Sequence, residues 1–332
     1  MGAIFKRTGK GQEMTITLQH LFWIIIFPGF LFTVAVGLVA SWVVRKVSAL
    51  VQWRVGPPLL QPLYDVVKLL AKETLVPQDA QQVVFKAAPL VALAATLLLS
   101  TMLWRIAISQ SAFVGDIVVA IYLMVLPSLA LIFGSSASAS PHAAVGTARE
   151  MKLVMSYELP LVLAFIVVII KTAALVEPSR QLDLAAIAQH TPALSISGML
   201  AFLVALLCMQ AKLGFVPFDI AEAETELGSG VLMEYSGALL AIWKLTQAML
   251  LVALPMFLVM VFLGGFATSG WPLVWGIGKY VLILVLMIVI KNTNPRVRID
   301  QAMKFFWFYC GIALVVAVVL AIIGNYTGIA WL

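Results

Sequence analysis

The chain has 332 residues, of which 63% are hydrophobic and only 11% are charged, and its mean hydropathy is +1.06. Soluble domains carry about 25% charged residues, so this composition excludes a water-soluble protein and predicts a polytopic membrane protein. The net charge of +6 and the pI near 9.3 fit basic cytoplasmic loops, and nucleic-acid binding is excluded as the main role.

Cysteine and histidine are too sparse to hold a redox metal. The two cysteines, Cys208 and Cys310, lie in apolar runs, and the sequence contains no CxxC. The histidines His20, His142 and His190 are too dispersed for a haem pair or a zinc site. Any cofactor is therefore expected in another chain.

Eight stretches have the roughly 20 mostly apolar residues that a membrane-spanning helix needs. In chain order they are 18–44, 83–107, 113–134, 154–176, 194–216, 237–265, 271–291 and 304–324. Prolines inside some spans are tolerated where neighbouring helices satisfy the freed backbone groups. The expected fold is all-α, with residues 1–332 forming a single integral membrane domain.

Eight spans place both termini on one side of the membrane. The connections on the opposite side carry about twice as many Lys and Arg residues as the terminal side. Those long connections are therefore expected to be cytoplasmic. The predicted location is the cytoplasmic membrane, with multiple passes and both termini outside.

The first cytoplasmic connection contains a predicted amphipathic helix at 59–73. Its apolar residues Leu59, Leu63, Val66 and Leu70 follow helical spacing, and Gln61, Asp65, Lys68 and Lys72 follow the same spacing on the opposite face. Such a helix can lie on the membrane surface. Alternatively, Lys68, Lys72 and Glu73 can form a docking face for a soluble partner.

Acidic residues gather in the connection between the fifth and sixth spans, which holds Asp219, Glu222, Glu224, Glu226 and Glu234. If 219–227 is helical, Asp219, Glu222 and Glu226 share one face. A capping box of Asp219 and Glu222 would explain two of the five carboxylates. Clustering and burial raise carboxyl pKa values, so the set also predicts a proton-handling role.

Two further acids precede or begin the fourth span. Glu150 is flanked by Arg149 and Lys152, which can make it a surface ion pair. Glu158 has no basic neighbour in sequence, and it can be satisfied by a hydroxyl or a Lys of another helix. Before the eighth span, Arg296, Arg298 and Asp300 suit either a positive-inside anchor or a loop fixed by paired charges.

Four segments carry a recognisable pattern: QWRVGPPLLQPLYDVVKLLAKE, SYE, GFVPFDIAEAETELGSGVLMEYSG and PRVRIDQ. With their order and spacing, the chain resembles the subunit 1 family of respiratory complex I and the related membrane-bound [NiFe] hydrogenases over nearly its whole length. Its first connection passes directly from Gly56–Pro58 into Leu59–Pro62. That compact form is similar to the hydrogenase branch.

The resemblance implies a subunit that anchors a peripheral arm and couples its redox chemistry to ion movement. The implied coupling path comprises Glu150, Glu158, Asp219, Glu222, Glu224, Glu226 and Glu234. The implied arm interface comprises Arg45, Arg54, Asp65, Lys68, Lys72, Glu73, Arg296, Arg298 and Asp300. The [NiFe] centre and the iron–sulfur clusters would belong to partner subunits.

The expected function is that of the membrane subunit of a hydrogenase that passes electrons from a ferredoxin-type donor to protons. Its implied partners are the hydrogenase large and small subunits, an iron–sulfur subunit, antiporter-like membrane subunits and the lipid bilayer. A quinone-reactive complex I subunit and the equivalent subunit of a sulfur-reducing complex stay open. So do an independent secondary transporter and a purely structural anchor.

Overall fold

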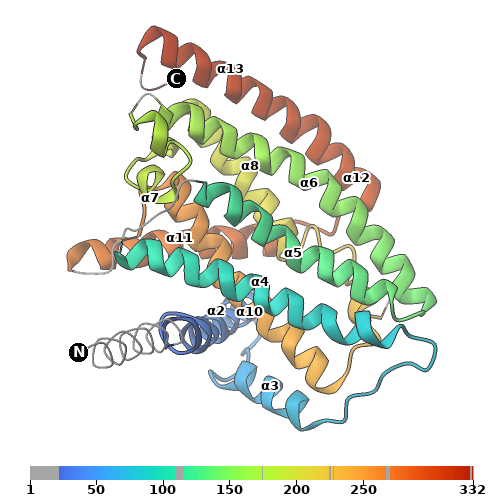
Figure 1. Cartoon of the computed structure of the whole chain (residues 1–332). Helices are drawn as coiled ribbons and strands as arrows, with labels where there is room; N and C mark the ends of the chain where they lie inside the picture. The colour runs from blue at the N-terminus through green and yellow to red at the C-terminus, as the bar shows by residue number, and fades with distance from the viewer. Residues whose placement is uncertain are drawn as a thin grey trace, which may run out of the picture.

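The computed structural model describes residues 22–109, 115–173, 175–223, 226, 228–266, 270–329 and 331, and these parts are predominantly helical (Figure 1). The main helices are α2 (Phe30–Val51), α3 (Gln61–Ala71), α4 (Gln82–Ser109), α5 (Asp116–Ser136), α6 (Pro141–Ala173), α8 (Ile196–Lys212), α10 (Gly237–Phe262), α11 (Trp271–Thr293) and α13 (Gly311–Thr327). Short helical turns are η1 (Pro178–Arg180), α7 (Leu184–Ile187), η2 (Pro192–Leu194), η3 (Gly230–Leu232), α12 (Ile299–Lys304) and the π-helical η4 (Phe305–Cys310).

Seven helical segments within the described ranges are long and apolar enough to cross a membrane. They are Phe22–Val51, Gln82–Ser109, Asp116–Ser136, Pro141–Ala173, Gly237–Phe262, Trp271–Thr293 and Ile299–Thr327. Each corresponds to a predicted span, so the prediction of a polytopic all-α membrane protein is confirmed.

The remaining predicted span, 194–216, corresponds to the shorter helix α8. Its 17 residues extend about 25 Å at 1.5 Å per residue, less than the roughly 30 Å of a bilayer core. The helix begins where the side chain of Ser195 accepts a hydrogen bond from the backbone N–H of Gly198, and it ends at Lys212. Residues 213–216, which the hydropathy pattern assigns to the span, lie in turns after the end of the helix.

Helix α6 begins at Pro141, well before the predicted start at residue 154. The predicted boundary followed hydropathy, but the polar residues before it continue the same helix. Glu150 and Glu158 therefore stand on one helix, eight residues and about 12 Å apart along its axis. This places one carboxylate about two turns from the other.

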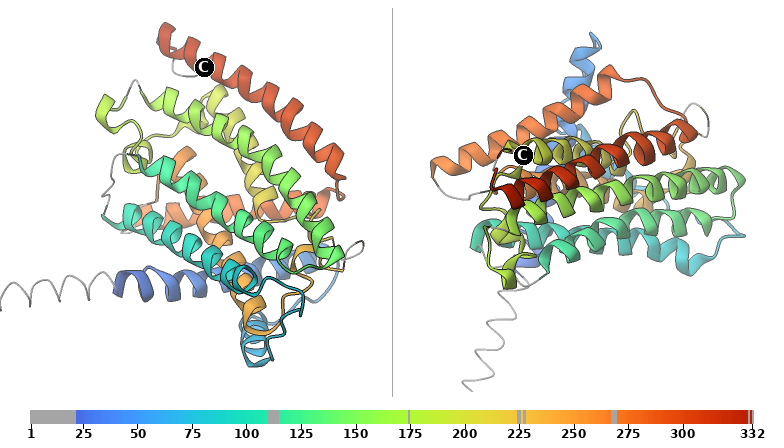
Figure 2. Two further views of the ribbon diagram at one scale, coloured as in Figure 1. Left: turned by 45° about the vertical axis from the view of Figure 1, so that its right-hand side comes forward. Right: turned by 90° about the horizontal axis from the view of Figure 1, so that it is seen from above.

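Helix α10 is the centre of the bundle. Nearly all of its residues from Ala248 to Phe262 are buried, which agrees with its being apolar on every side. It packs against α2, α3, α4, α8 and α11, whereas α13 lies at the far edge against α6 and α8 (Figures 1 and 2).

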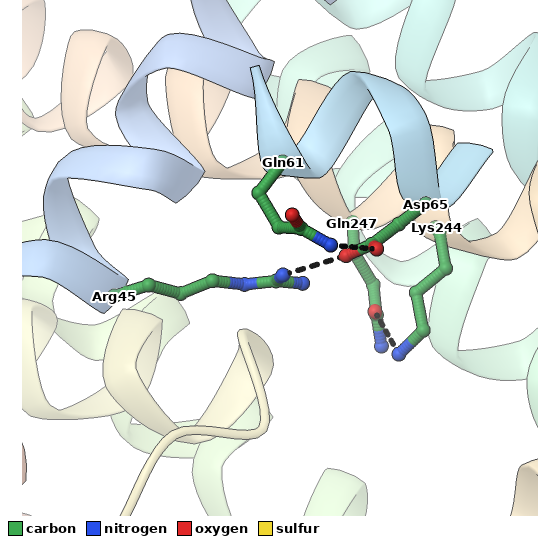
Figure 3. A network of polar contacts seen from close by, with 5 residues as sticks. All are labelled: Arg45, Gln61, Asp65, Lys244 and Gln247. Carbon is green, nitrogen blue, oxygen red and sulfur yellow. Dashed lines mark hydrogen bonds and ion pairs between the residues drawn. The ribbon is translucent and has the colours of Figure 1, made fainter. Parts of the chain in front are cut away.

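Helix α3 stands at one end of the bundle, packed on α10 and α2 (Figure 2). The predicted amphipathic helix over 59–73 is confirmed in its central part, and most of its apolar stripe lies on the surface of the chain, where a helix lying on a membrane presents its apolar residues. Only Val66 of that stripe is buried, together with Pro62, whereas Leu59, Leu63 and Leu70 are exposed. The polar residues Gln61 and Asp65 face α2, where Arg45 binds Asp65 (Figure 3).

Candidate functional site

A small polar cavity lies where α5, α6, α8, α10 and the segment after α8 meet. Its volume is about 60 Å³. A water needs roughly 10–15 Å³ by the same measure, so the cavity has room for about four waters. The polar side chains that line it are Ser128, Glu150, Lys212, Asp219, Glu222, Thr246 and Gln247.

Lys212 is the buried cation of this site. Its side chain is only 1% exposed, and its Nζ lies 2.5 Å from Oε1 of Glu158 on α6. The same ammonium donates to the carbonyl of Met124 at 3.2 Å, in the turn of α5 that Pro127 interrupts. It also lies 5.0 Å from the centre of the Tyr157 ring. A buried charge is stable only when it is paired and hydrogen-bonded, and these contacts supply both.

Glu222 connects the cavity to α10. Its Oε1 accepts a hydrogen bond from Nε2 of Gln247 at 3.0 Å, and Oε1 of Gln247 accepts from Nζ of Lys244 at 3.4 Å. Figure 3 shows the Lys244–Gln247 pair together with Arg45, Gln61 and Asp65. The polar contacts thus continue from the cavity along α10, the helix on which α3 packs.

The segment that carries the acidic residues differs from the prediction. Residues 213–223 form turns, bends and irregular backbone, so Asp219 and Glu222 neither share a helical face nor form a capping box. A backbone that passes close to itself explains this. Gly230 has φ +47, and a Cβ there would overlap the carbonyl oxygen of Ala221. The acidic side chains consequently point to different partners.

Two of these acids bind arginines of other elements. Asp219 accepts a hydrogen bond from Arg296 at 2.8 Å, and Glu226 accepts one from Arg149 at 2.6 Å. The side chain of Glu226 is 62% exposed, so it lies at the surface. Arg149 therefore pairs with Glu226, which removes Arg149 as the partner in the alternative of a surface ion pair at Glu150.

The structure brings together most, but not all, of the predicted coupling residues. Glu150, Asp219 and Glu222 line the cavity, and Glu158 reaches it through Lys212. Glu226 and Glu234 are not among the lining residues; Glu234 is half-buried just before Tyr235, which stacks on Phe85. Glu224 lies outside the described residues.

Sequence reasoning missed two members of this site. Lys212 ends one apolar run and Gln247 lies within another, so neither stands out as a site residue in the sequence. A Lys with no acid nearby in sequence, at the end of a long apolar run, signals a partner on another helix. For Gln247 the signal is an amide next to the long apolar run of α10, because buried amides need hydrogen-bond partners.

Arg45 lies in the C-terminal part of α2, and the other predicted arm-interface residues lie in connections between helices or in the short helices α3 and α12. Arg45 binds Asp65 at 2.9 Å, and Gln61 donates to the same carboxylate at 2.9 Å. Partial burial alone would raise the pKa of Asp65, but the hydrogen bonds from Arg45 and Gln61 outweigh it and lower that pKa. Arg54, Lys68, Lys72, Glu73, Arg296, Arg298 and Asp300 are exposed.

Two connections in this region are held by defined contacts. Lys46 Nζ donates to the carbonyl of Val55 at 2.6 Å, and the backbone N–H of Val297 donates to the carbonyl of Pro217 at 3.1 Å. The second contact ties the Arg296 connection to the acidic segment. Beside the first, Trp53 is 98% exposed, so a large apolar side chain is presented to the surroundings.

Comparison with known proteins agrees with this architecture. Residues 23–322 match the family model described as NADH dehydrogenase. The chain is 33% identical over 287 residues to an H subunit of the NADH-quinone oxidoreductase of Syntrophobacter fumaroxidans, covering 80% of this chain and 84% of that one. It is 34% identical over 315 residues to the corresponding H subunit of Syntrophotalea carbinolica, covering 89% and 93%.

A solved structure has the same fold. It belongs to the membrane-bound sulfane sulfur reductase, an archaeal respiratory membrane complex, and matches with a TM-score of 0.79 at 24% identity. The match covers 92% of this chain and 99% of the other. Taken with the family match over nearly the whole length, the sequence relatives assign the chain: it belongs to the NADH dehydrogenase family of membrane subunits, whose members include the H subunits of NADH-quinone oxidoreductases.

Proposed function

We propose that this chain couples redox chemistry in a peripheral arm to proton movement, as the membrane subunit of a complex I-like respiratory complex. One observation carries the proposal: Glu150 and Glu222 line one small polar cavity together with Lys212, which binds Glu158. Carboxylates that share a cavity oppose each other's ionisation. A change of charge nearby can therefore move a proton on or off the set.

The coupling would act through the Asp219–Arg296 pair. Arg296 lies in the exposed connection before α12, and Asp219 lines the cavity. Displacement of the Arg296 guanidinium removes a positive charge beside Asp219. Binding of a proton at the Asp219 carboxylate would then become more favourable, because a nearby opposite charge favours the ionised form. A movement of the arm would thus become a change in protonation.

The peripheral arm would dock on the exposed charges of the α2–α3 connection, α3 and the connection before α12. These parts are expected on the cytoplasmic side, with both termini outside. The arm would consist of hydrogenase large and small subunits and an iron–sulfur subunit. Antiporter-like subunits would continue the proton route within the bilayer.

For the arm chemistry we propose a membrane-bound [NiFe] hydrogenase that takes electrons from a ferredoxin-type donor. The compact first connection supports this choice, since only residues 52–60 separate α2 from α3. The metal centres would belong to the partner subunits, and this chain would contribute no redox group.

Quinone reduction is the second candidate. The favouring observation is that the relatives at 31–34% identity are named as H subunits of NADH-quinone oxidoreductases. A sulfur-reducing complex is the third, favoured by the shared fold with the membrane-bound sulfane sulfur reductase.

The coupling proposal is tested with Glu150→Gln and Glu222→Gln in the purified complex, reconstituted into liposomes. Both variants should retain electron transfer to an artificial dye and lose proton pumping. Asp79→Asn, at an exposed carboxylate of the α3–α4 connection, is the control and should retain both activities. Undiminished pumping in both Gln variants would contradict the mechanism.

The choice of arm chemistry is tested by purifying the complex and identifying its subunits and metals. Stoichiometric nickel in a co-purified large subunit, with hydrogen evolution from a low-potential donor, is the expected result. Saturable binding of a ubiquinone or menaquinone analogue would instead support the quinone candidate. Reduction of polysulfide without nickel would support the sulfur candidate.

A further inference from the structure

A second, larger cavity lies at the C-terminal end of α6. Its volume is about 610 Å³, within the range of ligand pockets in proteins. The last turn of α6, the α7–η2 connection, the start of α8 and the C-terminal part of α13 enclose it, at the end of the bundle where α13 ends (Figure 1). Its polar lining includes Lys171, Gln189, His190, Thr191, Asn325 and Trp331.

The chemistry of this lining suits an anion. Lys171 supplies a positive charge, the imidazole of His190 offers an N–H donor, and Thr191 offers an exposed hydroxyl. No carboxylate is among the described residues that line the cavity. Ammonium and hydroxyl groups of this kind bind phosphate oxygens by charge-assisted hydrogen bonds.

The walls are held in place by backbone and side-chain contacts. The backbone N–H of Ile196 donates to the carbonyl of Trp331 at 2.9 Å, which holds the C-terminal segment against the start of α8. Asn325 Nδ2 donates to the carbonyl of Ile170 at 2.7 Å, which joins α13 to α6 beside Lys171. The cavity is thus bounded by fixed elements on both sides.

The rim and the adjoining helix surface are apolar. Leu194 is 84% exposed, Leu175 67% and Trp331 62%. The outer face of α13 continues this surface with exposed Ile312 and Val319. A membrane helix with such a face contacts acyl chains, and Trp at a helix end prefers the headgroup level of the bilayer. An anion-binding cavity therefore opens beside a surface suited to lipid tails.

We propose that this cavity binds the phosphate headgroup of an anionic phospholipid, with its acyl chains lying along α13. The phosphate would bind the ammonium of Lys171, and the acyl chains would lie on the apolar face of α13. The bound lipid would fill the space between α6, α8 and α13 and hold α13 on the bundle. This lipid site shares no lining residue with the cavity of Glu150 and Glu222, so it does not depend on the proposed proton coupling.

The test uses the whole complex, purified in mild detergent and stripped of lipid. Native mass spectrometry and thermal unfolding follow the return of phosphatidylglycerol, of zwitterionic phosphatidylcholine and of inorganic phosphate. Phosphatidylglycerol should bind saturably to one site and raise the unfolding temperature. Lys171→Ala and His190→Ala should weaken that binding about tenfold each, the usual effect of losing one charge-assisted hydrogen bond.

Two comparisons make the result decisive. Lys171→Arg should keep the binding, and Lys86→Ala, at a Lys on α4 whose side chain contacts Gln82, should leave it unchanged. Equal binding of phosphatidylcholine, or unchanged binding in both Ala variants, would overturn the proposal. An equal thermal shift with inorganic phosphate alone would also overturn it, in favour of a free-phosphate site. If the Ala variants do not assemble, the headgroup comparison in the unmodified complex decides alone.

Discussion

Lys212 at the end of α8 and Glu158 in α6 form the most enclosed ion pair among the described residues, with 2.5 Å between their charged atoms. Lys212 is the last residue of α8, an apolar helix of 17 residues that is too short to span a bilayer. Because α8 is short, its last residue, the cation Lys212, lies inside the bundle. At the end of a helix that spans the whole bilayer, the same cation would lie at the membrane surface. The short helix and the polar cavity are two aspects of one arrangement.

Removing one member of this pair should destabilise the protein strongly. We expect Glu158→Gln to lower stability by about 3–5 kcal/mol, because it leaves the buried Lys212 without a counter-ion. Lys212→Met should cost less, because the remaining Glu158 is 20% exposed and can be hydrated or protonated. Thermal unfolding of the purified complex measures both effects.

The double variant, Glu158→Gln with Lys212→Met, is the control for this prediction. It removes both charges and should be more stable than Glu158→Gln alone. Strictly additive effects of the two substitutions would show that the pair contributes no coupling energy, and would contradict the arrangement described above.

The Asp219–Arg296 pair predicts a separate effect on coupling. Arg296→Ala should leave dye-linked electron transfer in place but lower the ratio of protons pumped to electrons transferred. Arg298→Ala, two residues away, is the matched control. The backbone N–H of Arg298 donates to the side chain of Gln301. The substitution keeps this hydrogen bond, because it changes only the side chain. The ratio is measured in liposomes with a pH-sensitive dye. An equal loss in both variants would indicate a general arm defect and no special role for Asp219–Arg296.

The helices were predictable because each consists of a long apolar run, and a span of about 20 residues leaves the backbone no other stable form in lipid. Their ends were less predictable, because hydropathy marks the membrane rather than the helix. Helix α6 continues through the polar residues from Pro141, and α8 ends at Lys212 before its apolar run does.

The sequence predicted the acidic residues of the site, but not how they are arranged in space. The carboxylates were found as a cluster in sequence, but a helical face could not place them, because the segment after α8 has no regular hydrogen-bond pattern. Its course depends on the close approach of Gly230 to Ala221. The partners Lys212 and Gln247 lie on other helices. They are 54 residues from Glu158 and 25 residues from Glu222 along the chain, and helical periodicity relates only residues a few positions apart.

The Arg45–Asp65 pair predicts a defined pH dependence. The folded-state pKa of Asp65 is below its ordinary value of 3.8, so the pair's contribution is complete above that pH. The contribution is lost as the pH falls through the folded-state pKa, because the unfolded chain then binds the proton more readily. Both side chains are more than a third exposed, so solvent screening limits the effect to about 0.2–1 kcal/mol.

The measurement compares thermal unfolding of the unmodified protein and Asp65→Asn across a range of about pH 3–8. The difference between them should be constant from about pH 5 to 8 and shrink below pH 3.8. A difference that grew as the pH fell would mean that the carboxyl pKa is raised on folding, contrary to the contacts with Arg45 and Gln61.

The packing of α6 against the acidic segment gives the last prediction. A methyl group on Gly146 would lie 2.8 Å from the backbone nitrogen of Val231 and 3.2 Å from the carbonyl oxygen of Ala221. Backbone atoms cannot rotate away, so Gly146→Ala should push the segment from α6 at a cost of about 1–3 kcal/mol. The displacement separates Glu150 on α6 from Glu222, so proton pumping should fall along with the unfolding temperature.

Gly278→Ala on α11 is the matched control. A Cβ there meets no atom within 4 Å, so the substitution causes no clash. Like Gly146→Ala, it replaces Gly by a better helix former, which favours the helix by about 1 kcal/mol. It should be as stable as the unmodified protein or slightly more so, and it should pump normally. If Gly146→Ala behaved in the same way, the segment would have room to move. That result would contradict the idea that the tight contact between α6 and the acidic segment positions the carboxylates.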